Sequence, residues 1–195
     1  KVIEIQKTKL EIVDLRLKPA TFDLRPSTLI WAEGADKSKG KSRYELYPAD
    51  ELVIYTTPAS PSDLRAVLEV VKPKIVHVLA VSPAKEKTDE FLARLAGMAK
   101  FAINNKGGKV SVNELAVATA QRVNAARIGL EWLAAGGHVS AVPEGEAVLL
   151  SAGNGAANQY LQKELFIAVR GILEETAAFR EYFAQADLEQ AFGGM

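Results

Sequence analysis

A strand–helix–strand pattern over residues 52–81 constrains this chain more than any other feature. Residues 52–56 are apolar, β-branched or aromatic, as in a buried strand. Ser60 then provides a helix N-cap and Pro61 fits the first helical position. The apolar residues that follow have helical spacing: Leu64, Val67, Leu68 and Val71. Residues 75–81 return as a nearly continuous apolar run. Such a unit is parallel and right-handed, so the chain is expected to contain an α/β sheet.

The remaining patterns predict two domains of an α/β protein. Alternating or short apolar runs at 10–15 and 28–32 add strands, giving a small Rossmann-like parallel-sheet domain over residues 1–83. The pattern changes after Ser82-Pro83, and residues 84–195 are expected to form a winged-helix-like α+β domain with a long C-terminal helix over about 156–185. Three helices are expected in this domain: one with an apolar stripe from Phe91 to Ala102, one that begins at the cap Ser111, and one with a stripe from Val123 to Leu133. A hairpin of two strands, 138–142 and 147–150, is expected to follow them.

Composition excludes several classes of protein. The chain has no cysteine, which excludes disulfide frameworks, zinc fingers and thiol catalysis and agrees with a cytoplasmic location. Its 24 basic and 24 acidic residues balance, so any contact with nucleic acid must be local. No apolar run approaches the length of roughly 18 residues that a membrane span needs, so we expect no membrane partner.

Catalytic patterns are missing from the sequence. The turn after the strand at 52–56, residues 57–61, has two prolines and no glycine, which disfavours a phosphate cradle. His77 and His138 are far apart, and Asp14 and Asp23 each have an arginine two residues later that favours local ion pairing. We therefore expect no catalytic residue, cofactor or metal site, and a hydrolase acting alone would need a cluster that the chain lacks.

Contact with DNA is the binding function that particular residues support. A basic, flexible loop carries Lys37, Lys39, Lys41 and Arg43, which suits electrostatic contact with a single strand. The third helix of the winged segment is expected to expose a polar face formed by Gln121, Asn124 and Arg127, with Arg122 beside it. Glu131 on that face, and Glu144 and Glu146 at the wing tip, oppose contact with phosphates.

Three motifs in this order resemble a known family. Residues 14–16, Asp-Leu-Arg, end the first strand; the strand 51–58 leads into Ser-Asp-Leu-Arg at 62–65; and the winged segment contains Arg-Ile-Gly-Leu-Glu-Trp-Leu at 127–133. Together they are similar to the C-terminal accessory region of RecJ-type single-stranded-DNA-specific exonucleases.

The resemblance implies a non-catalytic module of a larger enzyme. The parent would remove nucleotides from the 5′ end of single strands in DNA repair and recombination, with manganese or magnesium held by Asp-His-His motifs of its nuclease core. No position of this chain matches those motifs, and its start at Lys1 agrees with a piece of a longer polypeptide. The module would guide single-stranded DNA, or dock single-strand-binding protein or a helicase, beside the rest of the nuclease chain.

A second hypothesis is a protein similar to transcription regulators, in which the α/β half senses a small ligand and the winged helix binds duplex DNA. The glycine-free turn and the acidic wing count against it.

Overall fold

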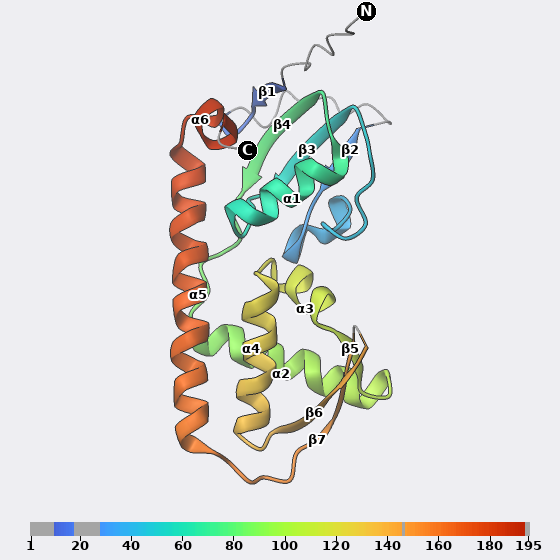
Figure 1. Ribbon diagram of the computed structural model, residues 1–195, viewed down its shortest axis with the longest axis vertical. Coiled ribbons are helices and arrows are strands. Elements are labelled where there is room, and N and C mark those ends of the chain that lie inside the picture. The colour runs from blue at the N-terminus through green and yellow to red at the C-terminus, as the bar shows by residue number, and fades with distance from the viewer. Residues whose placement is uncertain (1–9, 18–27, 146, 194–195) are drawn as a thin grey trace, which may run out of the picture.

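Two sheet-containing halves lie end to end, and one long helix runs along both of them (Figure 1). The computed structural model describes residues 10–17, 28–145 and 147–193. Asp23 and Glu146 lie outside the described residues. The combination of a parallel sheet, an antiparallel sheet and the long helix α5 (Gln159–Gln185) confirms the predicted mixed α/β class.

The first half contains a four-stranded parallel sheet. Its strands are β1 (Glu11–Asp14), β4 (Ile75–Val81), β3 (Glu51–Thr56) and β2 (Leu29–Trp31), in this spatial order. Helix α1 (Pro61–Val71) connects β3 to β4, as the sequence pattern predicts. The N-cap is confirmed, because the hydroxyl of Ser60 accepts the N–H of Asp63 at 3.1 Å. Lys72 ends the helix in the left-handed conformation, with φ of 50°.

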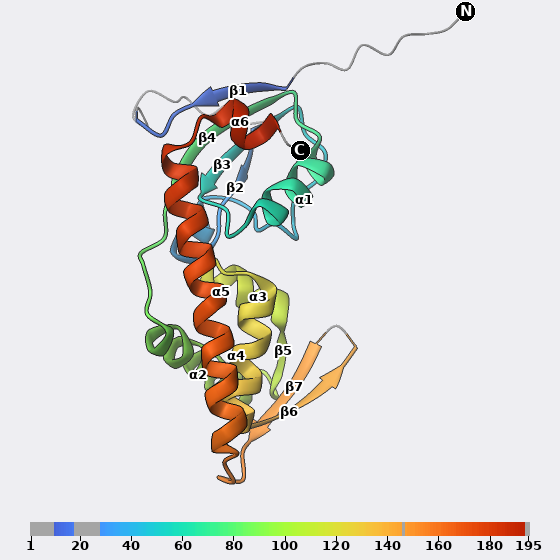
Figure 2. The ribbon, with the colours of Figure 1, turned by 60° about the vertical axis from the view of Figure 1, so that its left-hand side comes forward.

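The core of this half contains residues from both ends of the chain. Alternate residues of β3 and β4 pack against the buried stripe of α1: Leu52, Ile54, Val76 and Val78 against Leu64, Val67 and Val71. Phe183 of α5 and Leu188 and Phe192 of α6 (Leu188–Gly193) belong to the same core. Helix α6 lies beside β1 (Figure 2). The predicted division after residue 83 therefore separates the two sheets, but the end of the chain returns to the first core.

The second half has winged-helix topology. Helices α2 (Thr88–Asn105), α3 (Val112–Thr119) and α4 (Val123–Ala135) precede the hairpin of β6 (Val139–Glu144) and β7 (Ala147–Ala152). A short strand, β5 (Lys109–Ser111), completes an antiparallel sheet in the order β5-β7-β6. No sequence pattern predicts β5, since three residues are too few to show alternation.

Helix α5 contributes to both cores, and this determines which residues it buries. The buried positions are Val169, Leu173, Thr176, Arg180 and Phe183. The apolar spacing of the sequence predicts a stripe of Leu161, Leu165, Val169, Ile172, Thr176, Phe179 and Phe183. Val169, Thr176 and Phe183 of this stripe are buried as predicted, whereas Ile172 and Phe179 are only partly buried and Leu161 is exposed. The observed spacing of four, three, four and three residues includes an arginine, so a rule based on apolar residues does not find it. In the parts of the chain that the structure describes, no helix is both long enough and apolar enough to cross a membrane.

Candidate nucleic-acid interface

A buried ion-pair cluster occupies the carboxyl edge of the parallel sheet, where open α/β sheets usually bind ligands. The guanidinium of Arg43 forms ion pairs with Glu33 and, at 2.6 Å, with Asp63. Glu33 Oε1 also accepts the indole N–H of Trp31 at 2.8 Å. The side chains of Arg43 and Glu33 are 6% and 3% exposed. Burial lowers the pKa of Arg43, but the hydrogen bonds and charge of Glu33 and the charge of Asp63 outweigh it and hold that pKa above its usual value.

The turn between α3 and α4 contacts this cluster. The carbonyl of Gln121 accepts from Arg43 at 3.3 Å, and Arg180 of α5 donates to the carbonyl of Ala120. Arg122 donates to the carbonyl of Ala59 at 3.3 Å and pairs with Glu175 at 2.8 Å. The two halves are therefore joined by polar contacts over the 57–61 turn, in which Ala59 and Ser60 are buried.

The two halves approach each other closely at Gly34. Its φ of +67° suits glycine, and a Cβ there would lie 3.0 Å from the Cβ of Ala120. Gly34 begins the 3₁₀ helix η2 (Gly34–Lys39), which lies directly before the segment that carries Arg43.

Three of the residues predicted to contact DNA lie in this junction. Arg43 and Gln121 are buried there, and Arg122 is partly buried and ion-paired. The prediction treated each of them as an exposed side chain. In the structure the guanidinium groups of Arg43 and Arg122 bind carboxylates and backbone carbonyls, and the side chain of Gln121 is buried. In this arrangement Arg43, Gln121 and Arg122 are held in the junction and do not form part of an exposed interface.

The polar face of α4 is exposed beyond the junction. Asn124, Arg127 and Glu131 all point to solvent, as predicted. A cavity of about 440 Å³ lies between this face and the hairpin, and Arg127 and Glu131 both line it. Glu144 of the hairpin forms an ion pair with Lys109 at 3.2 Å. The groove of the winged helix therefore contains mixed charge.

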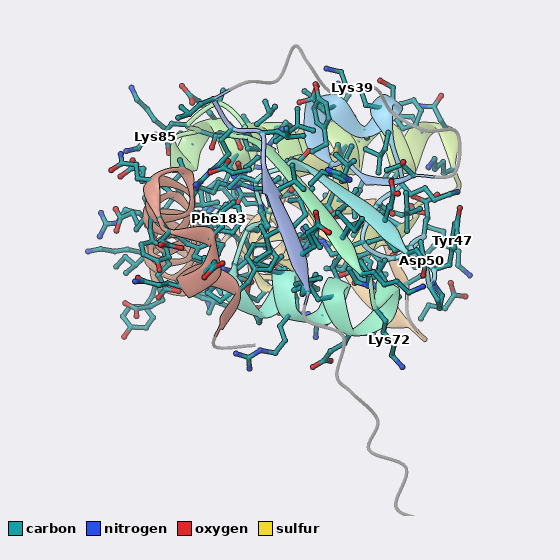
Figure 3. The ribbon with its side chains drawn as sticks, turned by 90° about the horizontal axis from the view of Figure 1, so that it is seen from above. Lys39, Tyr47, Asp50, Lys72, Lys85 and Phe183 are labelled. Atoms are coloured by element: carbon teal, nitrogen blue, oxygen red, sulfur yellow. The ribbon has the colours of Figure 1, made fainter. Side chains whose placement is uncertain are left out.

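The basic loop is a structured segment in the protein, and this corrects the prediction of a flexible loop. Lys37 and Lys39 lie on η2, and the N–H of Lys41 donates to the carbonyl of Ile30 at 2.8 Å, beside β2. The side chains of all three lysines are exposed. Lys39 pairs with Asp36 at 3.1 Å and lies 4.5 Å from the ring centre of Tyr55. Figure 3 shows Lys39 on the side of the sheet opposite Lys72 and α1.

A groove of about 1180 Å³ is lined by residues of this segment and of α2 and α3. Its lining combines the cations Lys37, Arg94 and Lys106 with the aromatic rings of Tyr44 and Phe101. Tyr44 and Phe101 are 49% and 56% exposed. The residues lie on segments far apart in the chain, so the sequence alone does not indicate that they are neighbours.

Two acidic residues also line this groove, Glu45 and Glu114. The carboxylate of Glu45 accepts the N–H and O–H of Ser42 at 2.9 and 2.6 Å, which lowers its pKa. Arg94 pairs with Glu86 at 2.6 Å. The exposed lysines Lys39 and Lys41 add positive charge next to the groove.

The candidate catalytic residues are apart from one another. His77 lies 3.9 Å from Glu51 within the sheet, whereas His138 is exposed before β6. Asp14 pairs with Arg16 at 2.6 Å, which confirms the local ion pair expected there. Across residues 10–17, 28–145 and 147–193, no three His, Cys, Asp or Glu side chains are grouped to hold a metal ion.

No family model, curated protein or solved structure matches the chain.

Proposed function

We propose that the chain is a non-catalytic module of a RecJ-like exonuclease, and that the groove between η2 and α2–α3 guides single-stranded DNA. The observation that supports this proposal is the combination of three cations and two exposed aromatic rings in that groove. The metal-dependent chemistry of the parent enzyme would belong to another part of its chain, with manganese or magnesium in the nuclease core.

The two kinds of side chain have different roles in binding a single strand. Lys37, with Lys39 and Lys41 next to it, attracts the phosphates, and releases counterions when a strand binds. Tyr44 and Phe101 offer faces for stacking of bases, which contributes about 1–3 kcal/mol per base without sequence preference. Salt is expected to weaken the first contribution much more than the second.

Binding of duplex DNA by α4 and the hairpin is less well supported. Glu131 lies on the same face of α4 as Arg127, and the charge of Lys109 is paired with Glu144. Gln121 and Arg122 would have to leave the junction to reach a duplex. Both hypotheses of DNA binding thus lose Gln121 and Arg122 as exposed contacts.

The experiment that tests the proposal is a fluorescence-anisotropy titration with labelled single-stranded DNA across a salt series. The triple variant Lys37→Ala, Lys39→Ala, Lys41→Ala is expected to bind more weakly. For this variant the slope of log K against log salt concentration should also be less steep, by about 0.7 for each phosphate that the lysines no longer neutralise. Phe101→Ala is expected to weaken binding while leaving that slope unchanged, since it removes stacking alone.

A matched variant controls for the total charge. Arg65→Ala, Lys74→Ala, Lys163→Ala removes the same charge from exposed positions on α1, the turn after it and α5. If this control loses as much affinity and slope as the first triple variant, the groove is not the binding site. If the unchanged protein does not bind single strands even at low salt, guiding of DNA is wrong and docking of a repair protein becomes the preferred role.

A further inference from the structure

The cavity between α4 and the β6–β7 hairpin, called the hairpin cavity below, adjoins the groove proposed for single strands. Asn113, an exposed residue in the first turn of α3, lines both the groove and the hairpin cavity. A strand that follows the groove past Asn113 would therefore enter the hairpin cavity. The volume of about 440 Å³ is within the range of pockets that hold small ligands, roughly 300–1,000 Å³, so there is room for one nucleotide.

Two opposite charges in the hairpin cavity are available to a ligand. Arg127 and Glu131 are four residues apart on α4, so their side chains leave one face of the helix. Both are exposed, and both line the cavity. Within residues 10–17, 28–145 and 147–193 neither forms an ion pair, whereas Arg170 and Glu174, with the same spacing on α5, lie 3.8 Å apart.

The wall opposite these charges is apolar. Ala141, Pro143 and Val148 of the hairpin line the cavity, and none of them is fully buried. Carbon atoms on this wall can contact the flat face of a base, which gains from leaving water. The polar edge of such a base would remain free to meet a side chain of α4.

We propose that the hairpin cavity binds one guanine nucleotide of a single strand that continues from the groove. The carboxylate of Glu131 accepts hydrogen bonds from N1–H and from the exocyclic amino group of guanine, while Arg127 binds a phosphate. Guanine is preferred because it alone among the four DNA bases has two adjacent donors on its pairing edge, which match the two carboxylate oxygens. The inference rests on the proposed function, since the groove supplies the strand.

The two possible effects of Glu131 on DNA differ in their dependence on the base. A carboxylate that only faces phosphates repels every strand, whatever its sequence. A carboxylate that accepts from guanine also repels a strand of thymines, but it attracts a strand that places guanine in the cavity. Removal of this charge should then strengthen binding of the first strand and weaken binding of the second.

The test compares labelled oligomers of equal length in fluorescence-anisotropy titrations: oligothymidine, alternating thymine–guanine and alternating thymine–adenine. Lithium is the only salt cation, so that guanine quadruplexes do not form. The unchanged protein is expected to bind the guanine oligomer about tenfold more tightly than the other two. Glu131→Gln is expected to lower the affinity for the guanine oligomer and to raise that for oligothymidine.

A matched variant removes the same charge elsewhere. Glu114 is exposed and lines the groove but not the hairpin cavity, so Glu114→Gln should raise the affinity for all three oligomers alike. Arg127→Ala should weaken all three and make the salt slope less steep by about 0.7. The proposal is overturned if the unchanged protein does not prefer the guanine oligomer, or if Glu131→Gln behaves like Glu114→Gln.

Free mononucleotides distinguish failure of the hairpin cavity from failure of the groove. In a nuclear magnetic resonance titration at constant ionic strength, 2′-deoxyguanosine monophosphate is expected to shift the Arg127 Nε–H signal saturably. The signal is assigned by its loss in Arg127→Lys. The adenine mononucleotide should shift it much less. If no oligomer binds, the groove proposal is wrong, and this titration still tests the cavity: equal shifts with both mononucleotides, or no shift, overturn the guanine site.

Discussion

At the scale of single residues, Arg43 is the side chain on which the contact between the halves depends. It pairs with Glu33 and Asp63 in a place where water does not compensate a lone charge. Arg43→Met would leave two carboxylates without their partner, and we expect the free energy of unfolding to fall by about 3–5 kcal/mol. Urea denaturation followed by circular dichroism measures this loss.

The control for this prediction is an ion pair at the surface. Lys74 and Asp50 lie 2.9 Å apart with side chains 63% and 72% exposed. Lys74→Met is expected to change stability by less than about 1 kcal/mol. Equal losses in the two variants would mean that burial does not strengthen the Arg43 cluster.

At the scale of elements, the C-terminal end of α5 is held by an arginine from the other end of the chain. Arg16 donates to the carbonyls of Phe183 at 2.6 Å and of Ala186 at 3.0 Å, while Asp14 orients it. A cation at a helix C-terminus satisfies free carbonyls and interacts well with the helix dipole. In Arg16→Gln we expect faster hydrogen exchange over residues 183–193, measured by mass spectrometry, and unchanged exchange in α4.

Arg65→Gln provides the comparison, since Arg65 is an exposed arginine on α1. Exchange over residues 183–193 that is identical in both variants would show that the Arg16 contact does not hold this end of α5.

At the scale of the whole molecule, α5 and the buried junction predict that the two halves unfold together. Phe183 is completely buried in the sheet core, on the same helix as Val169 in the other core. Phe183→Ala should cost about 3–5 kcal/mol, whereas Phe101→Ala, at an exposed position, should change stability by less than about 0.5 kcal/mol.

A variant with one tryptophan allows the unfolding of the sheet half and the unfolding of the helices to be followed by different signals. In Trp132→Phe, the fluorescence of buried Trp31 reports on the sheet half, while circular dichroism is dominated by the helices. Coincident urea midpoints are expected, with or without Phe183→Ala. Two separate midpoints would mean that the halves are independent domains despite the shared helix.

Local chemistry determined most of the elements of this protein, although not β5 or η2. The Ser60 cap, the stripe of α1 and the apolar run of β4 are contained in short windows of sequence, so the βαβ unit, the three helices with their hairpin and the long helix were all predictable. The exposed lysines at 37, 39 and 41 and the polar face of α4 follow from the same local patterns.

Tertiary structure alone decided which polar residues face solvent and which are buried. Arg43, Gln121 and Arg180 look like surface residues in the sequence, yet the closing of the sheet edge buries them. Tyr44 comes to line the same groove as Phe101 and Lys106 of the second half only when the halves pack. The physical reason is that burial of a charge depends on partners distant in the chain, whereas a cap or an apolar stripe depends on residues within a few positions.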